Sequence, residues 1–534
     1  MMKASSLPVA SPFKVRLWIL SLAIVGLIYL PLLFWGGIIC DDWGDIRQTW
    51  DCIGFFNCYR EWFPLFSNRP LAPLPITLST QLFSTHYSWY VIINTLIYLA
   101  ALGLTARALR DFLGSFALNT FFILAAVPCI AMPVIASPIN QLTATVAFLY
   151  WAISINLLRN FCQNGRPASY VLSYLILLCG FLTYEIILPL LLLTAFIPAL
   201  LKPQNLTKRP SKQWLTYFVQ FIMPILGVLL LVILWQKVLA PQFMEVFSRL
   251  DINSAHLLRN LYTWISVFIF QLPKLFIKAI PAISLYELVV FLFIGAFFYL
   301  GMQQEKKQQG QKLNWGFFWI CLASFVSSSL IFILSDQSAV SWGYQARGLS
   351  STWFALAILL ACLTQMASLS TSKIRLVSIF LILFFTCFSA LSFSIQRDKY
   401  IESWQLQMHI LGDAVALIKK QAIGPNASII GNVPRYTANN YNRELVFSQS
   451  WDFPAALVLY AQNQVRGGIV VDSRGNDLQN LRIENGVATV NDKGVVDFTN
   501  LWLYDYEPKT NKGELSRIKN STELQALITQ WQQK

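Results

Sequence analysis

Charged side chains are scarce in this chain of 534 residues: Asp, Glu, Lys and Arg make up 12% of it, against 56% hydrophobic residues. Soluble domains carry about 25% charged residues, so the composition excludes an ordinary soluble protein. Histidine is rarer still. The three histidines, His86, His256 and His409, are far apart in the sequence, which excludes a zinc site of the His-x-x-x-His type.

Sequence motifs of several common enzyme classes are also missing. The chain contains no phosphate-binding P-loop, no glycine-rich dinucleotide fingerprint and no Gly-x-Ser-x-Gly nucleophile elbow. These absences argue against nucleotide-dependent enzymes and serine hydrolases. The net charge of +14 raises the question of nucleic acid. The basic residues, however, are spread over short connections between apolar segments, so we expect no nucleic-acid partner.

Long apolar segments are what the chain has in abundance. A helix that crosses a bilayer needs about 20 such residues. Five runs without a charged residue have the length of a single span: 17–39, 213–236, 313–335, 348–372 and 376–396. Further single spans are expected near 88–106 and 284–302, and two-helix hairpins at 112–158 and 167–201. Together these segments predict about eleven transmembrane helices.

The basic residues indicate the orientation in the membrane. If the N-terminus is cytoplasmic, the six segments on that side hold sixteen basic residues and two acidic ones, Asp111 and Glu305. Cytoplasmic loops carry such an excess of Lys and Arg. We therefore expect a plasma (inner) membrane protein with an extracytoplasmic C-terminus, since the number of spans is odd. The first apolar run is too long for a signal-peptide core and is interpreted as a retained span.

The composition changes near residue 397, which divides the chain in two. Residues 1–396 form the predicted transmembrane unit, in which segments 70–83 and 256–280 are expected to lie in the membrane interface rather than cross it. Residues 397–534 contain more charge and alternate as strands do at 427–433, 467–473, 485–492 and 499–507, before a final helix at 523–534. The expected fold is an all-α polytopic membrane protein with a small C-terminal α/β or α+β domain outside the membrane.

Four carboxylates, Asp41, Asp42, Asp45 and Asp51, follow the first apolar run. A carboxylate at the end of a span meets both lipid headgroups and water, and apolar surroundings raise its pKa toward that of a general base. Asp41 and Asp42, the two nearest the membrane, are the candidate catalytic residues. The alternative is that they only begin the next helix, where Asp is a good cap. Asp45 and Asp51 lie farther from the membrane and are expected to matter less.

Four residues on the same side of the membrane are candidates for substrate binding. Arg69 closes the same loop, and Arg347 precedes a late span; a guanidinium holds phosphate through parallel hydrogen bonds. Tyr344 lies beside Arg347 in the late loop. Glu185 interrupts the 167–201 hairpin, and an ionisable residue at membrane depth is costly unless it has a function. The alternatives are headgroup anchors for the arginines and a water-exposed turn for Glu185.

Two cysteines of the first outer loop, Cys52 and Cys58, are separated by five residues. In an oxidising compartment they are expected to form a disulfide. Spacing alone leaves Cys40 open as a competing partner.

These features together resemble the C-type integral-membrane glycosyltransferases, which include protein O-mannosyltransferases, lipid A aminoarabinose transferases and O-antigen glucosyltransferases. The resemblance rests on Asp41-Asp42 directly after the first span, the loop that ends in Asn68-Arg69-Pro70, Glu185 in an outer turn and Arg347 in a late outer loop. It covers roughly residues 10–400. It implies that the Asp pair serves the catalytic site and that the sugar donor is a polyprenyl-phosphate lipid. Whether a divalent cation takes part stays open.

The expected function is therefore a membrane glycosyltransferase of the hexosyltransferase type. It would move a sugar from a polyprenyl-phosphate donor to a glycan, lipid or protein acceptor of the cell envelope. Two other classes stay open: a polysaccharide polymerase or ligase that uses lipid-pyrophosphate substrates, and a membrane transporter or flippase. The polymerases have larger, arginine-rich late outer loops. Transporters show internal repeats and charges inside spans, whereas nearly all charges here lie at the ends of spans.

Overall fold

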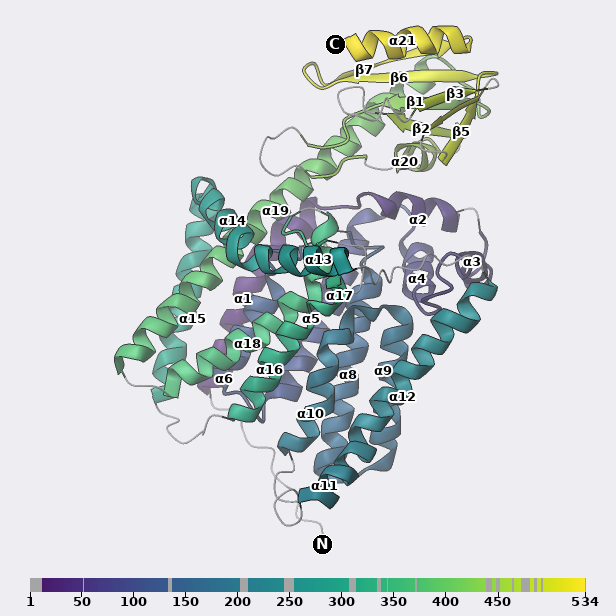
Figure 1. Ribbon diagram of the computed structural model, residues 1–534. Coiled ribbons are helices and arrows are strands. Elements are labelled where there is room, and N and C mark those ends of the chain that lie inside the picture. The colour runs from purple at the N-terminus through teal and green to yellow at the C-terminus, as the bar shows by residue number, and fades with distance from the viewer. Residues whose placement is uncertain are drawn as a thin grey trace.

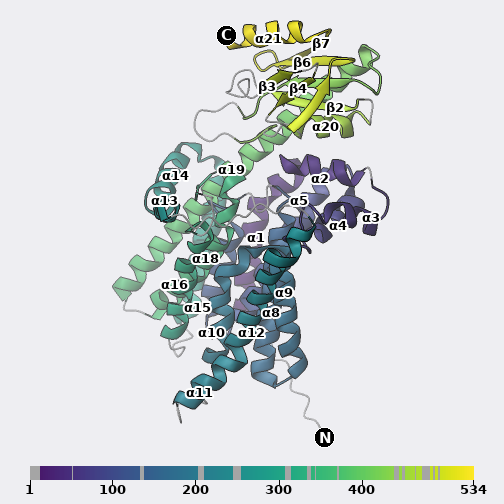
Figure 2. The ribbon, with the colours of Figure 1, turned by 45° about the vertical axis from the view of Figure 1, so that its right-hand side comes forward.

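A bundle of long apolar helices carries a small domain with a β-sheet at one end (Figures 1 and 2). The computed structural model describes residues 12–533 apart from gaps at 51, 133–136, 202–209, 244–253, 307–313, 334–337, 343, 370–371, 438–443, 448–451, 463–464, 472–480, 485–486 and 491–492. Asp51 falls in one of these gaps and lies outside the described residues.

The helices of the bundle coincide with the apolar segments of the sequence. They are α1 (Pro12–Trp35), α5 (Tyr87–Leu109), α6 (Ser115–Ala126), α8 (Leu142–Asn164), α9 (Pro167–Thr183), α10 (Leu191–Leu201), α11 (Pro210–Tyr217), α12 (Met223–Leu234), α15 (Leu285–Lys306), α16 (Trp315–Ser327), α17 (Leu330–Ile333), α18 (Ser350–Leu369) and α19 (Ser372–Lys420). Within the described ranges, nine helical segments are long and apolar enough to cross a membrane, and three shorter apolar helices accompany them. The chain is thus a helical, multi-pass membrane protein.

One of the nine long segments, Leu257–Ala282, differs from the others in direction. It comprises α13 (Ser254–Ser266) and α14 (Leu272–Ala279), joined by a π-helical turn. Figure 1 shows α13 running across the other helices, near the end of the bundle that carries the sheet domain. This direction agrees with the interfacial segment predicted at 256–280. Without it, eight long segments and three shorter ones remain, which equals the predicted number of spans.

Helix α18 packs in the middle of the bundle, against α6, α16 and α19. The ring of its Phe354 contacts three aromatic rings, with centroids 5.6 Å away at Phe121, 5.1 Å at Phe148 and 5.5 Å at Trp151. Its Trp353 donates a hydrogen bond of 2.7 Å to the backbone oxygen of Leu124. Edge-to-face and stacked rings of this kind pack well without leaving polar atoms unpaired. The centre of the bundle around α18 is therefore a packed core.

The first outer loop forms a layer of short helices over one end of the bundle. Its helices are α2 (Asp41–Trp50), α3 (Phe55–Trp62) and α4 (Pro73–Phe83). Helix α4 coincides with the segment predicted at 70–83. A disulfide between Cys52 and Cys58, with Cα atoms 5.3 Å apart, closes the connection from α2 to α3. The predicted pairing is confirmed, and Cys40 takes no part in it.

Helix α19 is a single helix of 49 residues that leaves the bundle and ends inside the sheet domain. At 1.5 Å per residue it is about 74 Å long, more than twice the thickness of a bilayer core. The sequence boundary between residues 396 and 397 falls inside this helix. We keep a division into a membrane unit (1–396) and a C-terminal domain (397–534) as a proposal, because one rigid element belongs to both.

The upper part of α19 holds the turn between α1 and α2 in place. Helix α1 ends at Gly36 and Gly37, and a Cβ atom on Gly37 would lie 2.2 Å from the indole ring of Trp404. The Tyr400 hydroxyl donates a hydrogen bond to the backbone oxygen of Gly37. Trp404 also stacks on Trp43 of α2, with ring centroids 6.0 Å apart. Glycine at position 37 therefore allows α19 to approach closely enough to fix the start of α2.

The C-terminal domain is built on a four-stranded mixed sheet in the order β2-β1-β6-β7. β1 pairs in parallel with β2 and β6, and β7 runs antiparallel to β6. Strands β3 to β5 form a separate antiparallel sheet. The elements are β1 (Ser428–Asn432), α20 (Asp452–Tyr460), β2 (Gly467–Val471), β3 (Leu481–Glu484), β4 (Val487–Val490), β5 (Lys493–Asp497), β6 (Leu501–Glu507), β7 (Lys512–Ile518) and α21 (Ser521–Gln533). The crossover helix α20 packs between the sheet and α2, so the domain contacts the first outer loop directly.

The disulfide generates a prediction that mass spectrometry checks. In protein unfolded without reductant, alkylation should leave Cys52 and Cys58 unmodified, and after reduction both should react. The seven other cysteines are outside disulfides and serve as the internal control, since they should be alkylated in both samples. Alkylation of Cys58 before reduction would contradict the pairing.

Candidate active site

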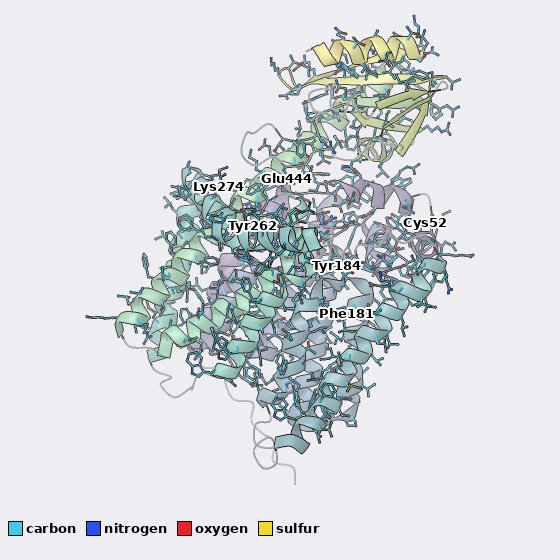
Figure 3. The ribbon with its side chains drawn as sticks, in the orientation of Figure 1. Cys52, Phe181, Tyr184, Tyr262, Lys274 and Glu444 are labelled. Atoms are coloured by element: carbon cyan, nitrogen blue, oxygen red, sulfur yellow. A yellow bond between two sulfur atoms is a disulfide. The ribbon has the colours of Figure 1, made fainter. Side chains whose placement is uncertain are left out.

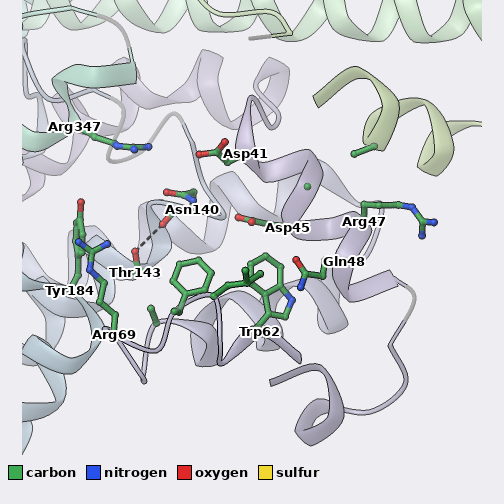
Figure 4. A pocket seen from close by; sticks show the side chains of 15 residues that line it. Asp41, Asp45, Arg47, Gln48, Trp62, Arg69, Asn140, Thr143, Tyr184 and Arg347 are labelled. Carbon is green, nitrogen blue, oxygen red and sulfur yellow. Dashed lines mark hydrogen bonds between the residues drawn. The ribbon is translucent and has the colours of Figure 1, made fainter. Parts of the chain in front are cut away.

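A cavity of about 640 Å³ lies where the first outer loop, the bundle and the C-terminal domain meet (Figure 4). Its walls come from α2, from segment 62–72, from the start of α8, from the end of α9, from the 3-10 helix η8 (Tyr344–Leu349) and from α20. The sequence places these elements hundreds of residues apart. Three of the predicted site residues line the cavity, namely Asp41, Arg69 and Arg347.

Asp41 is the first residue of α2, and its carboxylate faces the cavity (Figure 4). An acidic residue in the first turn is stabilised by the helix dipole, which explains why the helix begins here. Burial raises the pKa of Asp41, while the guanidinium of Arg347 acts in the opposite direction. A carboxylate whose pKa is raised by burial is a better proton acceptor than an exposed one, as a general base requires.

Asp42 takes a different position, although it is the next residue. It is fully buried and outside the cavity wall. Its carboxylate accepts hydrogen bonds from the backbone N–H of Asn140 (2.9 Å), the hydroxyl of Ser137 (3.2 Å) and the backbone N–H of Ile39 (3.3 Å). Asp42 thus ties the α1–α2 turn to the segment before α8. Of the two predicted catalytic residues, Asp41 is the one that a substrate can reach.

Asp45 lies one helical turn after Asp41 and also lines the cavity. It is buried, and within the described part of the chain its Oδ2 atom has no hydrogen-bond partner. Burial raises its pKa well above the usual value, and the negative charges of Asp42 and Asp41 raise it further. Asp45 thus shares the cavity with Asp41, because distance from the membrane edge does not describe which side of α2 a residue occupies. That it matters less than Asp41 and Asp42 stays a prediction.

Arg69 and Glu185 form a pair at one side of the cavity. The guanidinium donates two hydrogen bonds to the carboxylate, one of them 2.6 Å from Nε to Oε2. The ring of Tyr184, which also lines the cavity, lies under the guanidinium at 4.3 Å. Figure 3 shows Tyr184 above Phe181 at the outer end of α9. Glu185 therefore orients Arg69 and does not itself line the cavity, while the remaining N–H groups of Arg69 are available to a ligand.

The loop before α18 contributes the 3-10 helix η8 to the wall of the cavity. Arg347 lies in its last turn and its guanidinium points toward the cavity (Figure 4). Tyr344 begins the same 3-10 helix, but its side chain lies outside the described part of the chain. Sequence reasoning missed Tyr184, Asn140 and Trp62, which line the cavity as well. Tyr184 directly precedes Glu185, so the prediction of Glu185 already indicated this part of the chain. Asn140 and Trp62 carried no local signal.

The carboxylates do not form an evident metal site. Among the described residues, no group of three or more His, Cys, Asp and Glu side chains is placed to hold a metal ion. Both oxygens of Asp42 already accept hydrogen bonds from the protein, so this residue does not fit a ligand role.

Comparisons with known proteins identify similar solved structures. No protein-family model matches the chain, and no curated protein matches it. The chain is similar to the crystal structure of ArnT from Cupriavidus metallidurans in the apo state, with 13% identity over 84% of this chain and 85% of that one and a TM-score of 0.34. It is also similar to the same protein bound to undecaprenyl phosphate, with 15% identity, 86% of each chain covered and a TM-score of 0.36.

The buried position of Asp42 generates a prediction about stability. Burial is the main reason that its pKa rises to about 7, against the strong opposing effect of its hydrogen bonds. In the unfolded chain the same group has a pKa of about 3.9. The folded state therefore keeps a proton that the unfolded state loses, and the stabilising contribution is complete below about pH 4 and disappears as the pH rises through about 7.

We expect the thermal unfolding temperature of the detergent-solubilised protein to fall between about pH 5 and pH 8. This slope should be shallower in Asp42→Asn, since the amide keeps an acceptor for Asn140 but does not titrate. Asp398→Asn is the matched control, because Asp398 has an exposed side chain and should leave the slope unchanged. Equal slopes in the wild type and Asp42→Asn would show that Asp42 does not hold the proton.

Proposed function

We propose that this protein is a membrane glycosyltransferase, of the hexosyltransferase type. In this proposal it transfers a sugar from a polyprenyl-phosphate donor to a glycan, lipid or protein acceptor of the cell envelope. The observation that supports the proposal is the set of side chains that line one cavity. It combines a half-buried carboxylate, Asp41, with the guanidinium groups of Arg69 and Arg347, at the end of an apolar helix bundle.

Asp41 is proposed as the general base. Its carboxylate accepts the proton of an acceptor hydroxyl while the hydroxyl oxygen forms a bond to the anomeric carbon of the donor sugar. The bond between that carbon and the phosphate oxygen breaks, and its electron pair leaves with the lipid phosphate. The raised pKa of Asp41 suits this role, because proton transfer is most effective when the pKa of the base approaches the working pH.

The two arginines are proposed to bind the lipid phosphate. Negative charge increases on that phosphate as the sugar leaves, and cations fixed in a site that excludes water stabilise it strongly. Glu185 and the ring of Tyr184 hold the guanidinium of Arg69 in place. A guanidinium whose orientation is fixed loses less entropy when it binds phosphate.

The surroundings of the cavity support entry of the lipid donor from the membrane. The end of α12 reaches the loop that carries Arg69, where the indole of Trp235 donates a hydrogen bond of 2.7 Å to the backbone oxygen of Ser67. Helix α12 exposes large apolar side chains, among them Leu230, Leu231 and Ile233. Such a surface suits contact with lipid chains, including the tail of a polyprenyl donor.

We further propose that the protein resides in the plasma (inner) membrane with a cytoplasmic N-terminus. The excess of basic residues on one side supports this orientation. The cavity and the C-terminal domain then lie on the outer face, where nucleotide sugars are not available and a lipid-linked donor is required.

The role of Asp41 is tested by Asp41→Asn, which preserves size and helix capping but removes the base. We expect sugar transfer by the purified protein, measured with a panel of polyprenyl-phosphate sugars and an envelope extract as acceptor, to fall about 10²–10⁴-fold. Helical content and unfolding temperature should stay near those of the wild type. Asp398→Asn is again the control. Full transfer by the Asp41→Asn protein would refute the assignment.

The role of Arg69 is tested by Arg69→Lys. Lysine keeps the charge but cannot donate two parallel hydrogen bonds to Glu185 or to phosphate. We expect weaker binding of polyprenyl phosphate, by about tenfold, in a direct binding assay in nanodiscs. Arg60→Lys is the control, because Arg60 lies in the neighbouring helix α3 with an exposed side chain outside the cavity. Similar losses in both variants would indicate a general charge effect.

A further inference from the structure

The cavity has two chemically different sides. In Figure 4, Arg347, Tyr184 and Arg69 lie on one side, and Trp62, Gln48 and Arg47 lie on the other, with Asp41 and Asn140 between them. The proposed function uses the first side and the centre. The second side, to which Asp45 also belongs, has no role in it so far.

Two buried polar atoms on this second side lack a partner. The Oδ2 atom of Asp45 and the Nε1 atom of Trp62 make no hydrogen bond within the described part of the chain. Both side chains are more than nine-tenths buried, with relative exposures of 6% and 3%, and both line the cavity. A buried polar atom without a hydrogen bond destabilises the fold, so such atoms in a cavity wall indicate a ligand that completes their hydrogen bonds.

The second side also carries two aromatic rings. The ring of Trp62 is followed by that of Phe66, with centroids 5.5 Å apart and planes inclined by 36°, and both residues line the cavity. The amide of Gln48 adds a donor and an acceptor. Carboxyl, amide and indole N–H groups beside aromatic rings match a ligand that has hydroxyl groups at its rim and C–H groups on its face. A sugar ring has that chemistry.

We propose that the side of the cavity formed by Asp45, Gln48 and Trp62 binds the sugar ring of the donor lipid. This inference rests on the proposed function, which places the donor phosphate at Arg69 and Arg347. Asp45 and Trp62 are almost completely enclosed, which suits a small group delivered on the lipid. A glycan, lipid or protein acceptor is larger and requires an open approach to Asp41.

The C-terminal domain takes part in this subsite. Helix α20 packs on α2, and its Ala455 is a lining residue of the cavity. The carboxylate of Asp452, at the start of α20, acts electrostatically on Asp45. The C-terminal domain thus contributes a lining residue to the cavity that holds the subsite, through a helix packed on α2.

Binding measurements on the full-length protein in nanodiscs test the subsite. The probes are polyprenyl phosphate and the same lipid phosphate carrying a hexose, a pentose or an amino sugar. In the wild type, at least one sugar should strengthen binding about tenfold relative to the plain lipid. Trp62→Phe removes the indole N–H and Asp45→Ala removes the carboxyl; each should reduce this gain about five- to tenfold without weakening binding of the plain lipid. Trp50→Phe and Glu61→Gln are matched controls with exposed side chains in α2 and α3 and should keep the gain.

The outcomes separate this inference from the proposed function. If the wild type binds plain polyprenyl phosphate but gains nothing from any sugar, or if both variants keep the gain, the subsite is wrong and the phosphate site stands. Another outcome is that the sugar strengthens binding to the wild type but not to the Asp45 and Trp62 variants, while Arg69→Lys leaves binding of the plain lipid unchanged. In that case the subsite stands and the phosphate site is wrong. Binding of none of the lipids overturns both.

Discussion

The close approach of α19 to Gly37 is the contact on which the site depends. Helix α1 stops at two glycines, and the ring of Trp404 occupies the space that any larger side chain at position 37 would need. The same indole stacks on Trp43, and the Trp43 N–H donates a hydrogen bond of 2.7 Å to Gln407. One helix thereby sets the direction of α2 and, with it, the positions of Asp41 and Asp45. Packing of α19 against α2 thus positions the two carboxylates that line the cavity.

The carboxylates in and around the cavity differ in what they contact. Asp42 is satisfied by three hydrogen bonds and joins two segments of the chain. Glu185 is satisfied by Arg69 and orients it. Asp41 and Asp45, which face the cavity, carry the raised pKa values that burial imposes. Three carboxylates that look alike in the sequence are therefore divided into one that joins two segments of the chain, Asp42, and two that line the cavity, Asp41 and Asp45.

Much of the fold could be predicted because its signals are local. Apolar runs predicted the helices of the bundle, and alternating apolar and polar residues predicted strands β1, β2, β4 and β6. Strands β3, β5 and β7 and helix α20 were not predicted. Strand β7 is largely polar, and α20 is a short apolar stretch in a polar region. For the site, Asp41, Arg69 and Arg347 could be found because a charge next to an apolar run is conspicuous. Asn140 and Trp62 could not, because their importance comes from contacts between distant segments. The burial of Asp42 behind Asp41 likewise depends on the helical turn, which spacing along the chain does not reveal.

The unbroken course of α19 couples the bilayer to the cavity. A straight helix that is anchored in lipid at one end and carries a domain at the other behaves as a lever. Helices change their tilt when the hydrophobic thickness around them changes, and a tilt of a few degrees over the roughly 40 Å outside the bilayer displaces the far end by about 2–3 Å. Helix α20, which packs on both α19 and α2, lies at that far end. The position of the C-terminal domain over the cavity is thus tied to the same helix that passes through the bundle.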